Sequence, residues 1–102
     1  MSKPKAKKAG RKKESAGKKR VVLSLKAEPG SKVFVAGTFN GWDTTKKQLK
    51  DRTGKGDYQA TLLLPPGEYE YKFLVNGDWH VDPENPHWVT NEFGTLNNIL
   101  RI

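Results

Sequence analysis

The chain has 102 residues, no Cys and a formal net charge of +8, so it is long enough for one domain and cannot form a disulfide. Residues 1–20 carry ten basic residues and one acidic residue, whereas residues 21–102 carry nine basic and ten acidic residues. The high pI therefore reflects the first 20 residues and does not support a nucleic-acid-binding function for the rest. No apolar run is long enough to span a membrane, and the lack of Cys favours a reducing, cytoplasmic location.

Residues 1–20 consist of Lys, Arg, Ala, Gly, Ser and Pro with a single Met and a single Glu. They offer no large apolar side chain to a core, so we expect a disordered Lys-rich tail followed by a folded domain at residues 21–102. A tail of this charge is compatible with contact to polyanions such as nucleic acid or an anionic membrane. A solubilising extension without a specific partner is an equally good interpretation.

Alternating apolar and polar residues predict short strands in the first part of the domain. A first strand at residues 21–27 has an apolar face of Val21, Leu23, Leu25 and Ala27. After a Pro-Gly turn, a second strand at residues 32–36 has mixed faces that indicate burial on both sides. Asn40 and Gly41 mark a tight turn, and a short strand is expected near residues 48–50.

Two clearer strands are predicted at residues 58–64 and 68–75. In the second of them Lys72 points outward, because the opposite face is apolar and consists of Tyr69, Tyr71, Phe73 and Val75. The alternation therefore predicts a half-buried strand with one polar surface.

The remaining residues predict a hairpin, an irregular loop and a final strand. Asn76-Gly77 favours a type I′ turn that folds residues 79–81 back beside the preceding strand. Pro83 and Pro86 favour an irregular loop, and residues 95–102 form the last strand. No helix is predicted, and six or seven short strands separated by turns indicate an all-β, antiparallel immunoglobulin-like sandwich.

Catalysis finds little support among the residues. There is no Cys, and the only imidazoles, His80 and His87, flank a Pro-containing loop. Nothing resembles a catalytic triad or a metal cluster, so we expect no enzyme activity, no metal and no cofactor. Asp82 and Glu84 could be paired carboxylates for glycoside hydrolysis, but beside Pro83 we expect them to serve as turn and solvent-facing residues.

Two Trp residues follow turns directly, Trp42 after Asn40-Gly41 and Trp79 after the Asn76-Gly77-Asp78 turn. An indole at a turn offers a flat apolar face to a ligand, and sugar rings have matching C–H faces. Burial of either Trp as a plug at the edge of the core is an equally good interpretation of the spacing alone.

Sugars also need partners for their hydroxyl groups, and Lys72, Thr95 and Asn97 are predicted to point outward from strands that could be neighbours. A cross-strand ion pair is the alternative role for Lys72, and ordinary strand polarity is the alternative for Thr95 and Asn97.

Five motifs occur in order and at close spacing: Val33-Phe-Val-Ala-Gly-Thr-Phe-Asn-Gly-Trp42, Pro66-Gly-Glu-Tyr-Glu-Tyr-Lys-Phe73, Asn76-Gly-Asp-Trp79, Asp82-Pro83 and Gly94-Thr-Leu-Asn-Asn98. Over residues 21–102 the chain resembles the glycogen-binding domain of AMP-activated protein kinase β subunits and the related carbohydrate-binding modules at the N-terminus of isoamylases and branching enzymes. The resemblance implies an early-set immunoglobulin-like sandwich without catalytic activity that binds α-1,4-linked glucan, glycogen or starch-like.

Carried over motif by motif, the resemblance implies that Trp42 and Trp79 stack on sugars, that Lys72 hydrogen-bonds hydroxyl groups, and that Thr95 and Asn97 complete the polar contacts. Phe93 stands where kinase β subunits usually have a Leu that reaches into the ring of a curved glucan, so its contact is expected to be flatter. The loop from residue 82 to residue 93 is one residue longer than the kinase pattern and adds Trp88, which is expected either to pack inward or to extend the platform.

The implied ligands are glycogen and maltooligosaccharides, and the implied partners are a kinase or a glycogen-metabolising enzyme. A protein-interaction or scaffold domain of the same fold is the rival hypothesis, because fold alone does not determine function.

Overall fold

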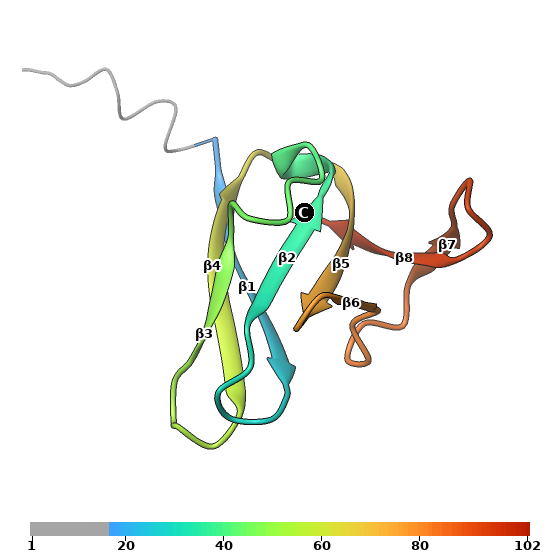
Figure 1. The fold of residues 1–102 in the computed structure, drawn as a ribbon. Coiled ribbons are helices and arrows are strands. Elements are labelled where there is room, and N and C mark those ends of the chain that lie inside the picture. Colours follow the sequence, from blue (N-terminus) through green and yellow to red (C-terminus); the bar gives the residue numbers. More distant parts are fainter. Residues whose placement is uncertain (1–16) are drawn as a thin grey trace, which may run out of the picture.

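The computed structural model describes residues 17–102, which form eight β-strands and one short 3-10 helix (Figure 1). The elements are β1 (Lys19–Lys26), β2 (Val33–Gly37), η1 (Thr38–Asn40), β3 (Gln48–Asp51), β4 (Asp57–Leu64), β5 (Glu68–Val75), β6 (Asp78–His80), β7 (Trp88–Thr90) and β8 (Leu96–Arg101). Most of the predicted Lys-rich tail, residues 1–16, lies outside the described residues, so its disorder and the division of the chain at residue 20 stay predictions.

All strand pairs are antiparallel, and the strand order is β1-β4-β3-β2-β5-β8-β7, with β6 paired to the end of β5. Short strand β3 joins two halves, because it pairs with β4 on one side and with β2 on the other. The sheet curls so that β1 and β4 lie on one side and β5 and β8 on the other, while β7 projects to the side (Figure 1). The predicted all-β antiparallel sandwich is confirmed.

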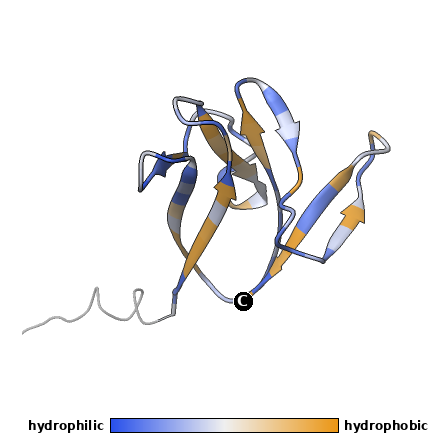
Figure 2. Ribbon diagram, turned by 90° about the horizontal axis from the view of Figure 1, so that it is seen from below, coloured by the Kyte–Doolittle hydropathy of each residue, from blue (hydrophilic) through white to orange (hydrophobic). Residues whose placement is uncertain are grey.

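The core lies between the two halves and draws its side chains from both. Apolar segments alternate with polar ones along the longer strands (Figure 2), as expected where one face of a strand is buried. The buried cluster consists of Leu23, Leu25, Val33, Val35, Leu49, Tyr58, Ala60, Leu62, Leu64, Tyr71 and Phe73. The period-two predictions for the strands at residues 21–27, 58–64 and 68–75 are therefore confirmed.

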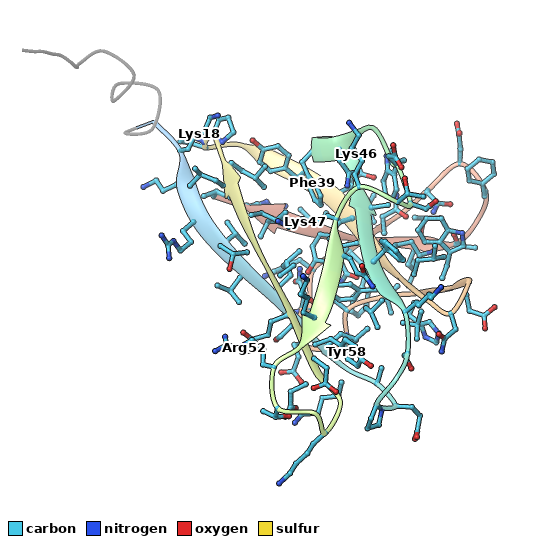
Figure 3. All side chains as sticks on the ribbon, turned by 60° about the vertical axis from the view of Figure 1, so that its left-hand side comes forward. Lys18, Phe39, Lys46, Lys47, Arg52 and Tyr58 are labelled. Carbon is cyan, nitrogen blue, oxygen red and sulfur yellow. The ribbon has the colours of Figure 1, made fainter. Side chains whose placement is uncertain are left out.

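Two aromatic residues close opposite ends of the sandwich (Figure 3). Phe39 of η1 packs against the core cluster and meets Tyr69 edge to face, with ring centroids 6.3 Å apart. At the other end, the Tyr58 hydroxyl donates to the Glu28 carbonyl oxygen over 2.9 Å and accepts from the Ser31 N–H. Phe39 thus covers one end of the core, and Tyr58 covers the other end and also holds the loop between β1 and β2.

The type I′ hairpin predicted at Asn76-Gly77 is confirmed, because both residues have positive φ, at 50° and 89°. Two elements were missed. The 3-10 helix η1 is a single turn without periodicity, so its residues carry no helical pattern. The irregular loop predicted after Pro83 in fact contains β7, whose three residues form a strand only by pairing with β8.

Candidate functional site

Strand register places three of the candidate residues on the face that β5 and β8 turn away from the core. Paired residues in antiparallel strands share a face, and Trp79 of β6 pairs with Leu74 of β5, two residues beyond Lys72. Tyr71 pairs with Asn98 on the core face, so the neighbouring residues Lys72 and Asn97 both point to the opposite face. The sheet itself therefore brings Lys72, Trp79 and Asn97 together.

Trp42 reaches the same face through a tight turn after β2. The Asn40 side-chain oxygen accepts from the Gly37 N–H over 3.0 Å, and the Trp42 N–H donates to the Gly37 carbonyl oxygen over 2.8 Å. Gly41 and Trp42 both have positive φ, at 67° and 59°. A bulky residue in this left-handed region is strained, and such strain persists only where surrounding contacts hold it.

The indole rings of Trp42 and Trp79 meet edge to face, with centroids 6.5 Å apart and planes inclined by 70°. Trp79 is 47% exposed and Trp42 is half-buried. Neither belongs to the core cluster, so the interpretation of the two Trp as plugs at the core edge is wrong.

An open cavity of about 820 Å³ lies over this face. All six residues predicted from the sequence line it: Trp42, Lys72, Trp79, Phe93, Thr95 and Asn97. Its wall also includes Glu70, Thr90, Asn91 and Glu92, which were not predicted. Glu70 could have been predicted from the sequence, because its position two residues before Lys72 places it on the same face of β5.

A chain of side-chain hydrogen bonds runs across the floor of the cavity. The Lys72 ammonium donates to the Thr95 hydroxyl oxygen over 3.2 Å, and the Asn97 amide donates to a carboxylate oxygen of Glu70 over 3.0 Å. The Asn91 amide group joins these two pairs, because it donates to Thr95 over 2.8 Å and to the Asn97 side-chain oxygen over 2.9 Å.

Two sequence predictions about these polar residues need correction. Asn97 was expected to face solvent, but it is only 6% exposed, because Asn91 and Glu70 cover both ends of its amide. The cross-strand ion pair considered for Lys72 is not formed: within residues 17–102 the ion pairs are Lys26–Asp57 and Arg101–Glu68.

Phe93 is the most exposed large apolar residue of the part of the chain described, at 81%. It lies in the loop that joins β7 to β8, next to Gly94, whose φ of 81° favours glycine. An exposed aromatic ring at the rim of a cavity is an available apolar contact for a ligand.

Trp88 follows neither of its two predicted roles. It is 55% exposed, so it is not packed inward. It pairs with Asn98, whose partner Tyr71 lies on the core face, so Trp88 points to the face opposite the cavity. It does not line the cavity and does not extend the Trp42–Trp79 pair.

The Asp82 carboxylate belongs to a buried network outside the cavity. Asp82 is 6% exposed and accepts from the Tyr71 hydroxyl over 2.7 Å, so its prediction as solvent-facing is wrong. Its role in a turn is confirmed, because it accepts from the Glu84 N–H over 2.9 Å. Burial raises the pKa of Tyr71 well above its ordinary value, with Asp82 adding to the effect, so this hydroxyl stays a donor.

Within residues 17–102 no group of three or more His, Cys, Asp or Glu side chains is arranged to hold a metal ion. The described part of the chain also contains no helix long and apolar enough to cross a membrane.

Fold and site together define an antiparallel β-sandwich that carries an open aromatic and polar groove on one sheet face. The chain belongs to the family described as the glycogen recognition site of AMP-activated protein kinase, whose family model matches residues 20–102. This confirms the resemblance seen in the motifs.

Individual relatives agree with the family assignment. The chain is 42% identical over 76 residues to the 5'-AMP-activated protein kinase subunit beta-2 of Mus musculus, and the matched residues cover 74% of this chain and 27% of that protein. It is 41% identical over 73 residues to the 5'-AMP-activated protein kinase subunit beta-1 of Sus scrofa, and the matched residues cover 72% of this chain and 56% of that sequence. The chain thus spans about a quarter of the length of the beta-2 relative.

Proposed function

We propose that this chain binds α-1,4-linked glucan, glycogen or starch-like, without acting on it chemically. The contacts are stacking on Trp42 and Trp79, an apolar contact to Phe93, and hydrogen bonds to Lys72, Thr95 and Asn97. The observation that carries the proposal is that these six residues, drawn from separate segments of the chain, line one cavity. Membership of a glycogen-recognition family supports the same ligand class.

The angle between the two indole planes favours a curved ligand. Rings inclined by 70° cannot both lie flat against one extended, ribbon-like chain. An α-1,4-linked glucan turns from one glucose unit to the next, so successive sugar faces can meet the two rings in turn. The geometry therefore favours α-linked over flat β-1,4-linked chains.

The affinity for a short oligosaccharide should be modest. Sugar hydroxyl groups must give up water, and a flexible glucan must be ordered, so we expect a Kd on the order of micromolar to millimolar. Glycogen should retain the protein more firmly, because its many chain ends keep further binding sites close to the one from which the protein dissociates.

Mobility in native gels containing glycogen tests the proposal. Glycogen should retard the wild type, and Trp79→Ala should remove most of the retardation. Trp88→Ala is a matched control, because it removes a similarly exposed indole from the opposite sheet face. Equal retardation of the wild type and Trp79→Ala, or equal losses in both Trp variants, would contradict the proposal.

Glucan binding also suggests which partners the domain has. We expect the domain to hold an associated kinase or glycogen-metabolising enzyme close to glucan in the cytoplasm. The basic residues before β1 are a candidate contact for polyanions, because eight of them lie within residues 1–18. Removing residues 1–18 should abolish salt-dependent binding to a polyanion column and leave glucan binding unchanged, and loss of glucan binding would contradict this division.

A further inference from the structure

The Asn91 side chain forms hydrogen bonds both to the loop that carries Phe93 and to the polar residues Thr95 and Asn97 on the floor of the cavity. Asn91 follows β7 directly and lies in the loop that carries Phe93, on the wall of the cavity. Its side-chain oxygen accepts from the Phe93 N–H over 2.9 Å and from the Thr95 N–H over 3.1 Å. Its side-chain nitrogen donates to the Thr95 hydroxyl and to the Asn97 side-chain oxygen.

These four bonds use the full capacity of the amide, which has two N–H donors and two acceptor sites on its oxygen. A ligand could bond to Asn91 only by displacing one of them. The main chain strengthens the arrangement, because the Asn91 N–H donates to the Thr95 carbonyl oxygen over 2.7 Å and its own carbonyl accepts from Gly94. Asn91 is therefore built to hold its neighbours and not to touch a sugar.

The oxygen and the nitrogen of the Asn91 amide bond to different parts of the site: the oxygen to the loop backbone and the nitrogen to polar side chains. Through its oxygen, Asn91 fixes the backbone from which the Phe93 ring projects, and through its nitrogen it orients Thr95 and Asn97. Asn97 in turn is held at its other end by Glu70. Without the Asn91 side chain, the loop would lose the two bonds that its oxygen accepts from Phe93 and Thr95. The polar floor would separate into a Lys72–Thr95 pair and an Asn97–Glu70 pair.

The bonds also determine what Thr95 can offer to a ligand. Its hydroxyl oxygen already accepts from Lys72 and from Asn91, which occupies both of its lone pairs. The hydroxyl hydrogen remains, so Thr95 faces the cavity as a donor. Lys72 uses one of three N–H groups on Thr95, so it too has donors left. The ligand atom at this point is then an acceptor, such as a hydroxyl or ring oxygen of a sugar.

We propose that Asn91 is a positioning residue for glucan binding, which couples the exposed Phe93 ring to the polar floor at Thr95 and Asn97. The proposal rests on the glucan-binding function proposed above. The Asn91 bonds hold the Phe93 loop and the polar floor in their binding arrangement before the ligand arrives. Binding then does not have to supply the free energy for ordering the loop.

Titration calorimetry of maltoheptaose into the full chain tests this. Asn91→Ala should weaken binding by roughly tenfold, since ordering the loop and the floor then opposes binding. Asn91→Asp keeps the oxygen acceptors for Phe93 and Thr95 and loses the donors, so it should lie between Asn91→Ala and the wild type. Asp51→Ala is the matched control, because Asp51 holds the 51–57 loop through four backbone N–H groups away from the cavity. It should lower stability and leave the affinity unchanged.

A double-mutant cycle with Phe93 separates positioning from a general loss of structure. Phe93→Ala should weaken binding clearly in the wild type and much less in Asn91→Ala, because the ring is already poorly placed there. Simple addition of the two effects, or full affinity in Asn91→Ala, would overturn the proposal while wild-type binding upholds the proposed function. Failure of the wild type to bind maltoheptaose or glycogen would overturn both.

Discussion

The backbone of Gly37 at the end of β2 packs directly against the Glu70 carbonyl of β5. A Cβ atom at this position would collide with that carbonyl oxygen and would also press on the Phe39 ring and the Tyr71 side chain. Gly37 also accepts the Trp42 N–H, so the same close approach starts the turn that delivers Trp42 to the cavity.

Gly37→Ala is therefore expected to affect both stability and binding. Relieving the collision requires a shift of β2 against β5, which should lower the free energy of unfolding by about 1–3 kcal/mol. The displaced turn should also weaken glucan binding. Denaturant unfolding and calorimetry would measure the two effects. Gly54→Ala is the control, because nothing lies within 4 Å of its added Cβ and only its φ of 78° is unfavourable. The backbone strain in Gly54→Ala should lower stability without affecting the site, so a loss of glucan binding in Gly54→Ala as large as that in Gly37→Ala would contradict the prediction.

Phe93 provides a prediction in which binding and stability separate. Because the ring is 81% exposed, Phe93→Ala should change the free energy of unfolding by less than about 0.5 kcal/mol. Maltoheptaose binding should fall severalfold, and Phe93→Leu should retain part of it. Thermal unfolding and calorimetry on the same samples provide the comparison. A variant that binds as the wild type does would exclude Phe93 from the site.

The sequence predicted the fold well where the pattern was local. Alternation along residues 58–64 and 68–75 and the Asn76-Gly77 turn are properties of neighbouring residues, and the structure confirms them. Strand β7 could not be predicted in this way. Its three exposed residues have no alternation of burial, and they form a strand only because β8 pairs with them.

The same distinction explains the candidate site. Trp42, Lys72 and Trp79 were found because turns and strand parity mark them individually. Asn91 carried no such mark, since its importance arises only from the four bonds it makes once its loop has closed. The burial of Asn97 escaped prediction for the same reason, because the side chains that cover it come from β5 and the β7–β8 loop.

Tyr71→Phe should reveal the buried network beneath the site. The Tyr71 hydroxyl donates to Asp82 and accepts from the Asn85 amide over 3.1 Å. Removing it leaves a buried carboxylate without that donor, which should lower the free energy of unfolding by about 1.5–3 kcal/mol. Tyr69→Phe is a matched control, because the Tyr69 hydroxyl donates to the Pro65 carbonyl oxygen at an exposed position, and it should change stability by about 1 kcal/mol or less. If denaturant unfolding shows equal losses of unfolding free energy in the two variants, the bond to Asp82 stabilises the fold no more than an exposed hydrogen bond does.

Acid should destabilise the domain through carboxylates at the β3–β4 end. Hydrogen bonds from Lys26 and Thr53 hold the pKa of Asp57 below its ordinary value of 3.8. Burial acts to raise the pKa of Asp51, but N–H groups of Gly56, Asp57, Gly54 and Thr53 together outweigh it, and the pKa is lowered. A carboxyl group with a lower pKa in the folded state binds fewer protons there, so its stabilisation is present above the unfolded pKa.

That stabilisation should be lost as the pH falls from about 4 through the folded pKa values. The melting temperature should therefore be steady from neutral pH to about pH 5 and should fall steeply below about pH 4. Asp51→Asn should start from a lower melting temperature and lose less of it on acidification, because one of the titrating groups has been removed. Differential scanning calorimetry over this range provides the measurement. An unchanged slope in Asp51→Asn would mean that the loop carboxylate does not contribute to acid sensitivity.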